Sequence, residues 1–115
     1  MQPDSTPQIS ATQTVELLDG DGAVLLDVRE QHEWDAGHAP QARHLAMSEL
    51  AGRVSEIPAD VPVICVCHAG GRSAAVSEAL NRAGFNSLNL SGGMVAWEAA
   101  GLPVVDDVGG PGVVV

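Results

Sequence analysis

Short apolar runs alternate with amphipathic segments along the 115-residue chain. Residues 23–26 and 62–66 are almost continuously apolar, which is typical of parallel strands that are buried on both faces. Weaker strand candidates lie at residues 42–45 and 86–90. Because these runs alternate with stretches of helical periodicity, the pattern predicts an α/β domain with a mostly parallel sheet.

Apolar residues at helical spacing predict helices between these strands. The first helix begins after Ser10, which forms a capping-box pattern with Gln13, and it ends at Gly20. The other expected helices cover residues 30–35, 48–57, 72–83 and 94–100. Glycines follow three of these segments at positions 37, 84 and 101, and glycine is common where a helix ends.

The chain length favours one domain, with residues 9–104 carrying the expected elements. Residues 1–8 are rich in proline and polar side chains, and we expect them to be flexible. Residues 105–115 are rich in glycine, and we expect them to form a loose C-terminal tail. A hydrophobic content of 45% excludes an acidic disordered chain.

The chain is strongly acidic. Five Lys+Arg against fifteen Asp+Glu give a formal net charge of −10, and all five basic residues are arginine. Such a chain offers no basic surface to nucleic acid or to an anionic membrane, so we expect neither as a partner. The N-terminus does not resemble a secretory signal, and the longest apolar run, residues 61–67, is too short to span a bilayer. These features predict a cytoplasmic protein.

Cys67 follows the most hydrophobic predicted strand and precedes a predicted helix. The residues of this loop are Cys67, His68, Ala69, Gly70, Gly71, Arg72 and Ser73. A thiol in this position lies near the positive end of the helix dipole, and a glycine-rich turn can point backbone N–H groups toward it. Arg72 and His68 would add a permanent and a titratable cation. The arrangement predicts a lowered thiol pKa and a nucleophilic thiolate.

Cys65 lies within the same predicted strand, and we interpret it as a core residue. Side chains two positions apart in a strand seldom reach disulfide geometry, so we do not expect a bond between Cys65 and Cys67. The lack of a disulfide framework suits a reducing compartment. A free cysteine is more often a buried small residue than a nucleophile. The strand, turn and helix around Cys67 favour the nucleophile at that position.

Three blocks of the chain together resemble the rhodanese-homology sulfurtransferases. Residues 26–42 are similar to an Asp-Val-Arg-Glu start followed by Gly-His-x-Pro-Gly-Ala, with Ala39 and Gln41 in place of the common Ile and Gly. Residues 67–73 resemble a Cys-x-x-Gly-x-Arg-Ser loop, and residues 90–104 resemble a closing Gly-Gly-x-x-x-Trp and Gly-x-Pro-Val pattern. The order and spacing of the blocks carry the resemblance, which covers nearly all of the expected domain.

The resemblance implies a single rhodanese-like domain with a five-stranded sheet and helices on both faces. It also implies a thiosulfate sulfurtransferase-like enzyme that carries sulfur as a persulfide on Cys67, without a cofactor. The donor would be a small sulfur anion such as thiosulfate, and the acceptor would be cyanide or a thiol. Thioredoxin, glutathione and a sulfur-carrier protein are candidate acceptors. Relatives with a strong thiosulfate preference often have basic residues just after the cysteine, where this chain has His68 and Ala69.

Two other functions remain open at this point. Phosphatases and arsenate reductases also use a cysteine-based anion loop, but such phosphatases need an arginine six positions after the cysteine, where this chain has Ser73. The second alternative is a non-catalytic binding or regulatory module, which some rhodanese domains have become. Those domains usually lack the cysteine that this chain keeps.

The remaining polar residues have plausible structural roles. Asp27, at the end of a predicted strand, can either orient the loop or Arg29, or cap the next turn. The resemblance to the rhodanese family implies that Asp27 and Arg29 support the site. We expect Glu33 and His38 to be structural. The evenly spaced histidines at positions 32, 38 and 44 do not match zinc-ligand spacing, so we expect no metal site. We expect Trp34 and Trp97 to anchor the core.

Overall fold

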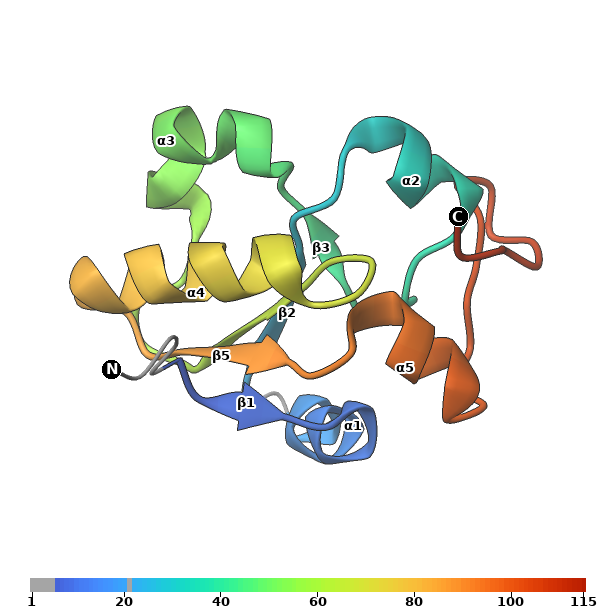
Figure 1. The fold of residues 1–115 in the computed structure, drawn as a ribbon, viewed down its shortest axis with the longest axis horizontal. Coiled ribbons are helices and arrows are strands. Elements are labelled where there is room, and N and C mark those ends of the chain that lie inside the picture. The colour runs from blue at the N-terminus through green and yellow to red at the C-terminus, as the bar shows by residue number, and fades with distance from the viewer. Residues whose placement is uncertain (1–5, 21) are drawn as a thin grey trace.

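The computed structural model describes residues 6–20 and 22–115, which form a five-stranded parallel sheet in the order β1-β5-β4-β2-β3. The strands are β1 (Gln8–Ile9), β2 (Val24–Asp27), β3 (Arg43–His44), β4 (Val63–Val66) and β5 (Ser87–Leu90). This topology confirms the predicted α/β class (Figure 1). The two apolar runs form β2 and β4, which pair with each other near the middle of the sheet.

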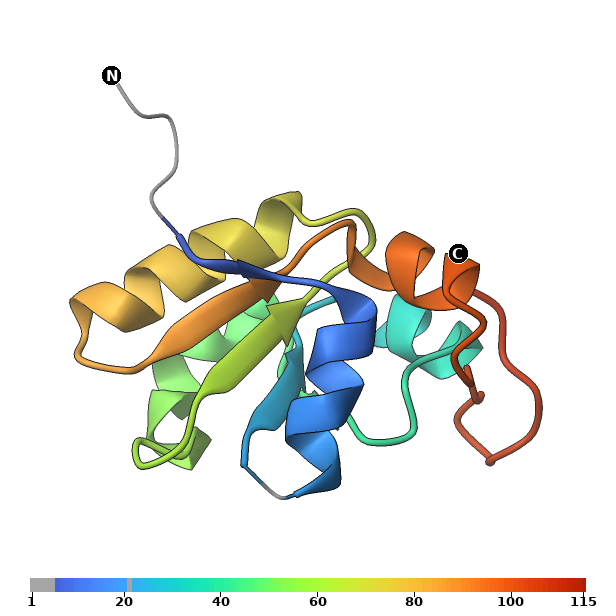
Figure 2. The ribbon, with the colours of Figure 1, turned by 90° about the horizontal axis from the view of Figure 1, so that it is seen from below.

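Helices cover both faces of the sheet (Figures 1 and 2). They are α1 (Ala11–Asp19), α2 (Gln31–Ala36), α3 (Leu50–Arg53), α4 (Gly71–Arg82) and α5 (Gly93–Ala99). The predicted capping box is confirmed, because Gln13 N–H donates to Ser10 Oγ and Ser10 N–H donates to Gln13 Oε1, each at 3.1 Å. Among the described residues, no helix has the length and apolar character that a membrane crossing requires.

Alternating strand residues build two hydrophobic cores, one on each face. Leu25 and Ile64 belong to the core that α1 and α5 cover, and its largest buried side chain is Trp97. Leu26 and Cys65, their neighbours in sequence, belong to the opposite core, which includes Val76 and Leu80 of α4. The period of two along each strand sends successive side chains to opposite faces. Both faces of the sheet are therefore buried, as the continuous apolar runs predict.

The expected helix over residues 48–57 is broken into three short pieces. A 3₁₀ turn (Met47–Glu49), α3 and a second 3₁₀ turn (Val54–Glu56) replace it. The prediction of one helix was wrong. Ile57 is buried and Leu50 packs against the core on the α4 side although no continuous helix joins them. The apolar spacing of this segment therefore reflects its contacts with the core and not one helical face.

The sheet begins earlier in the chain than expected. Gln8 of β1 pairs with Asn89 of β5, and the carbonyl of Pro7 accepts from Asn89 N–H at 2.8 Å. The end of the segment expected to be flexible, residues 1–8, is therefore part of the folded domain. Residues 1–5 of that segment lie outside the described residues.

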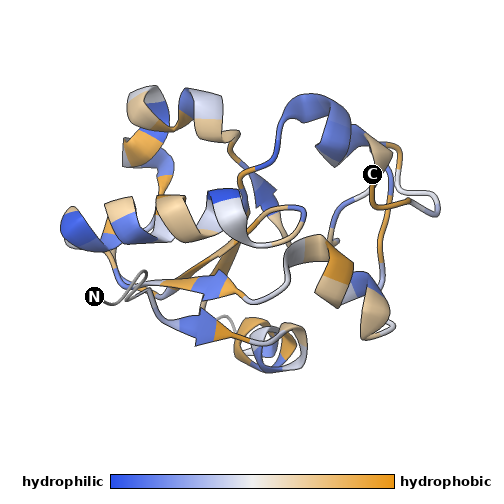
Figure 3. Ribbon diagram, viewed as in Figure 1, coloured by the Kyte–Doolittle hydropathy of each residue, from blue (hydrophilic) through white to orange (hydrophobic). Residues whose placement is uncertain are grey.

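The C-terminal residues, expected to be loose, pack onto the domain. Val105 forms bridges with His38 and Pro111, and Val113 N–H donates to the carbonyl of Ala36 at 2.9 Å. Gly112 lies so close to Gly37 that a Cβ there would come within 2.8 Å of the Gly37 Cα. Figure 3 shows this hydrophobic end of the chain beside the hydrophilic α2. The tail thus covers the end of α2, and Val114 packs against the α5-side core.

Removing residues 112–115 should lower the free energy of unfolding by about 1–3 kcal/mol, since it removes two backbone hydrogen bonds and part of one apolar contact. Urea denaturation measures the change. Val108→Ala is the control, because Val108 is 85% exposed and its truncation should leave stability unchanged. Equal stability of the truncated and full-length chains would show that the tail contributes nothing to the fold.

Candidate active site

Cys67 directly follows β4 at the edge of the sheet where the parallel strands end. Asp27, the last residue of β2, is paired with Val66 of β4, so the segments after both strands emerge together. Ligands of open α/β sheets bind at this edge. The loop after Cys67 then leads into α4 (Figure 1).

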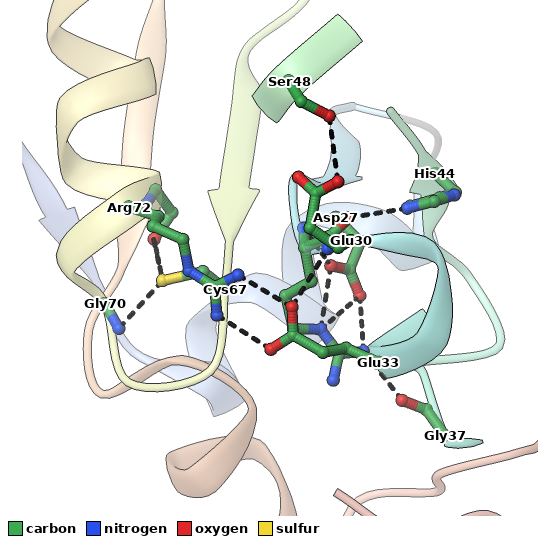
Figure 4. Close-up of polar contacts among 11 residues, drawn as sticks. Asp27, Glu30, Glu33, Gly37, His44, Ser48, Cys67, Gly70 and Arg72 are labelled. Carbon is green, nitrogen blue, oxygen red and sulfur yellow. Dashed lines mark hydrogen bonds and ion pairs between the residues drawn. The ribbon is translucent and has the colours of Figure 1, made fainter. Parts of the chain in front are cut away.

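Three donors surround the sulfur of Cys67. Its Sγ accepts from Gly70 N–H at 3.1 Å, from Ser73 N–H at 3.4 Å and from the Ser73 hydroxyl at 3.2 Å. Gly70 has a φ of 113°, a left-handed conformation that glycine adopts without strain, and it caps α4. The loop and the first turn of α4 therefore fold around one sulfur atom (Figure 4).

The first N–H groups of α5 hold the backbone of the same loop. Met94 N–H donates to the carbonyl of Cys67 at 2.8 Å, and Val95 N–H donates to the carbonyl of His68 at 3.1 Å. A Cβ on Gly93 would lie 2.5 Å from both carbonyl oxygens, and Gly93 has a φ of 61°. Only glycine fits this close approach of α5 to the Cys67 loop. This explains Gly93 in the Gly-Gly pair of residues 90–104.

The hydrogen bonds around Cys67 favour its thiolate. Burial alone would raise the pKa of the Cys67 thiol, because it penalises the charged form. The Ser73 hydroxyl and the N–H groups of Ser73, Gly70 and Ala69 outweigh burial, so the pKa is lowered from its usual value. The direction agrees with the sequence analysis, although neutral dipoles rather than nearby cations are its main cause.

Asn89 of β5 joins this network, and the sequence analysis did not identify it. Its Nδ2 donates to the carbonyl of Gly70 at 3.2 Å and to Gln8 Oε1 at 3.0 Å, so its Oδ1 accepts from the Ser73 hydroxyl at 2.5 Å. A hydroxyl has one proton, so Asn89 Oδ1 and Cys67 Sγ compete for it. The only local signal was a polar residue inside a predicted strand.

Arg72 does not face the sulfur as a free cation. Its Nη1 and Nη2 donate to Glu33 Oε1 and Oε2 of α2 at 2.8 and 2.9 Å (Figure 4). The Arg72 guanidinium beside Glu33 lowers the pKa of that carboxyl to about 2. The ion pair therefore connects the Cys67 loop to α2, a contact across 39 positions of the sequence.

Asp27 and Arg29 form a second ion pair, fully buried. Asp27 Oδ1 accepts from Arg29 N–H at 3.1 Å, and Asp27 Oδ2 accepts from Arg29 Nη2 at 2.8 Å. The same Nη2 donates to the carbonyl of Gly37 at 2.7 Å. Because Arg29 precedes α2 and Gly37 follows it, these contacts connect the two ends of the segment that carries α2. The pair thus supports Glu33, and through Glu33 it supports the loop.

The other predicted loop residues make fewer contacts. His68 is half-buried, and its Nδ1 has no hydrogen-bond partner among the described residues. Ala69 is exposed, and Gly71 is the first residue of α4 with open space where a Cβ would be. The structure therefore brings Gly70 and Ser73 to the sulfur through hydrogen bonds, and the Ala69 N–H also favours the thiolate. His68 and Gly71 belong to the loop without such a bond.

Trp34 is not the core anchor that was expected, whereas Trp97 is fully buried. The Trp34 ring is half-buried and stacks against His38, at a centroid distance of 3.5 Å, and against His44, at 4.9 Å. Trp34 lies outside the core because α2 follows β2 beyond the edge where the strands end, and there its ring packs against imidazoles rather than aliphatic side chains. Residues 6–20 and 22–115 contain no group of three or more His, Cys, Asp or Glu side chains that could hold a metal ion.

Cys65 has the core position assigned to it. It is fully buried beside Ser87, whose Oγ lies 3.6 Å from Cys65 Sγ. Burial raises the pKa of this thiol. The two cysteines therefore differ in environment, and only Cys67 lies among donors at the end of a strand.

Comparison with known proteins identifies the family. The model of the rhodanese-like domain family matches residues 10–100. The chain belongs to this family. A rhodanese-related protein from Thermoplasma volcanium has the same fold, with a TM-score of 0.80, 31% identity, and coverage of 86% of this chain and 97% of that one.

Curated relatives are named as sulfurtransferases. The chain is 38% identical to thiosulfate sulfurtransferase GlpE of Pseudoalteromonas translucida over 80% of its own length and 89% of the relative's. It is 39% identical to a sulfurtransferase of Allochromatium vinosum over 77% and 84% of the two chains. The rhodanese-like domain of this chain is thus a member of a sulfurtransferase family, which implies a sulfur donor and an acceptor as substrates.

Ser73→Ala should raise the pKa of Cys67, because it removes a hydroxyl that donates to Cys67 Sγ at 3.2 Å and lowers that pKa. At neutral pH, alkylation of Cys67 by iodoacetamide should slow roughly tenfold, the size expected for a lost hydrogen bond to a charged group. The pH dependence of alkylation measures the shift. Ser77→Ala is the matched control, since Ser77 is equally buried in α4 but bonds to Ser87. An unchanged profile in Ser73→Ala would refute the role of the hydroxyl.

Gly93→Ala should destabilise the fold and displace the loop. The left-handed backbone alone costs about 1–2 kcal/mol, and the clash with the Cys67 and His68 carbonyls adds to it. Gly101→Ala separates the two effects, because Gly101 has a φ of 76° but open space around its Cβ position. Both variants should unfold at lower urea concentration, and only Gly93→Ala should also alter Cys67 alkylation. Identical alkylation in the two variants would count against the close approach.

Proposed function

We propose that this rhodanese-like domain transfers a sulfane sulfur through a persulfide on Cys67. The observation that supports it is the set of three donors around Cys67 Sγ, at 3.1 to 3.4 Å. Such donors stabilise an anionic sulfur in place, without rearrangement during the reaction. The relatives named as sulfurtransferases support the same chemistry.

The reaction has two steps, with thiosulfate as the example of a donor. The Cys67 thiolate attacks the outer sulfur of thiosulfate, the S–S bond breaks, and sulfite leaves with the bonding electron pair. Cys67 then carries the persulfide, Cys–S–S⁻. In the second step an acceptor such as cyanide or a thiolate attacks the outer sulfur, and the Cys67 thiolate is restored. Thioredoxin, glutathione and a sulfur-carrier protein in the cytoplasm are the proposed acceptors, and no cofactor takes part.

The geometry favours sulfur transfer over phosphate chemistry. Ser73 stands six positions after Cys67, where a phosphatase would place an arginine, and both its N–H and its hydroxyl point to Sγ. The single arginine of the loop, Arg72, is bound to Glu33. A tetrahedral phosphate needs several donors beyond the sulfur, whereas this loop closes on the sulfur itself. The intact cysteine and its donors also argue against a non-catalytic module.

Cys67→Ser should abolish transfer, since it removes the atom that carries the sulfur. Intact-mass measurement after incubation with thiosulfate or glutathione persulfide should show a gain of one sulfur atom in the natural chain and none in Cys67→Ser. Cys65→Ala is the control and should keep the gain, because Cys65 is fully buried in the core. A natural chain that gains no sulfur from either donor, yet hydrolyses an aryl phosphate, would overturn the proposal in favour of a phosphatase.

A further inference from the structure

The Glu33 carboxylate binds Arg72 through both terminal nitrogens, in the paired geometry that makes such ion pairs strong. Glu33 is itself fixed, because its Oε1 accepts from Glu30 N–H at 3.0 Å in the capping box of α2. The Glu33 side chain is only 12% exposed, against 38% for Arg72. The pair is therefore a built contact beside the Cys67 loop, unlike the exposed pairs that Arg53 makes with Glu49 and Glu56.

The charges near Cys67 cancel in pairs. Arg72 is the only arginine or lysine among residues 67–73, and Glu33 neutralises it. Asp27 and Arg29 neutralise each other. With Cys67 as a thiolate, these five groups sum to one negative charge. A dianion such as thiosulfate therefore meets no uncompensated cation from these groups, although it must bring two negative charges to the thiolate.

We propose that Glu33 is a specificity-determining residue: by holding Arg72, it makes the site favour sulfur donors with at most one negative charge, such as alkyl persulfides, over thiosulfate. The inference rests on the proposed function. A donor of this class needs little charge compensation, because its sulfane sulfur enters the ring of N–H and O–H donors around Cys67. Its uncharged alkyl part does not require Arg72.

The step balances for such a donor. The Cys67 thiolate attacks the terminal sulfur of R–S–S–H, a new S–S bond forms, and the old S–S bond breaks. The electron pair of the broken bond leaves with R–S⁻, which is stable as a thiolate or takes a proton from water. Cys67 carries Cys–S–SH, which loses its proton within the ring of donors. No oxidant or reductant is needed.

The ion pair between Glu33 and Arg72 persists throughout the neutral pH range. The pKa of Glu33 is lowered to about 2, so its carboxylate is charged above that value. The contribution of the pair is complete above the ordinary carboxyl pKa of about 4.5, and it is lost only as the pH falls toward 2. Lowering the pH would protonate carboxylates of ordinary pKa before it protonates Glu33. The Glu33 carboxylate must therefore be removed by substitution.

Glu33→Gln removes the charge and keeps an oxygen that can accept from Glu30 N–H, so α2 should keep its cap. With Arg72 released, kcat/KM for thiosulfate should rise roughly fivefold to tenfold, the effect of unmasking one charge at short range. The value for an alkyl persulfide with no charged substituent, 2-hydroxyethyl persulfide, should change less than twofold. The double variant Glu33→Gln/Arg72→Ala should lose the gain, because the gain acts through Arg72.

Glu30→Gln is the matched control. It removes the same charge from the same helix cap, but Glu30 bonds to Ser48 and does not contact Arg72. It should therefore leave the ratio of the two kcat/KM values unchanged. Glu33→Ser, a second way to remove the carboxylate, should shift the ratio in the same direction as Glu33→Gln. It keeps the test decisive if the glutamine variant does not fold.

The outcomes separate this inference from the proposed function. If thiosulfate and the persulfide both load Cys67 and Glu33→Gln leaves their ratio unchanged, sulfur transfer stands and the role of Glu33 is overturned. The same holds if Glu30→Gln raises the ratio as much as Glu33→Gln does, since the effect would then be general charge. If neither donor loads Cys67 in any variant, the proposed function fails, and the role of Glu33 fails with it.

Discussion

The placement of Cys67 between two helices is the constraint on which the rest of the site depends. The N–H groups at the start of α5 bind the carbonyls of Cys67 and His68, while those at the start of α4 bind the sulfur. Because the carbonyls are held on one side, the sulfur and the inward N–H groups must lie on the other. The close approach at Gly93 makes this division possible. The geometry of the sulfur is therefore set by the sheet and both helices rather than by the loop alone.

This arrangement explains how an acidic protein can stabilise an anion. The permanent charges beside the loop are paired, Asp27 with Arg29 and Glu33 with Arg72, so they contribute little net field at the sulfur. The thiolate is stabilised instead by neutral N–H and O–H groups at hydrogen-bond distance from the sulfur. The formal charge of −10 acts over longer distances, where salt screens it within about 8–10 Å. Acidity of the surface and stabilisation of a thiolate are thus compatible.

The sequence predicts the parts of the fold that follow from local pattern. The apolar runs of β2 and β4, the capping box of α1 and the glycine-rich turn after Cys67 each carry their signal within a few residues. The parts it missed depend on distant partners. Gln8 forms a strand only because it pairs with Asn89, and Glu33 looks like an ordinary surface residue until α2 lies beside Arg72. The glycine-rich tail gives no hint of the gap at Gly37 that it fills.

The Ser73 hydroxyl shows how the fold tunes the chemistry through one such distant contact. Asn89 is oriented by Gln8 and Gly70, so its Oδ1 always presents an acceptor to Ser73. When Cys67 is a thiol, its S–H can donate to Ser73 Oγ while the hydroxyl donates to Asn89. When Cys67 is a thiolate, the hydroxyl can turn to the sulfur at 3.2 Å. Ionisation then requires one hydroxyl rotation and no movement of the backbone. Asn89 of β5 therefore influences the Cys67 sulfur through the Ser73 hydroxyl and not by direct contact.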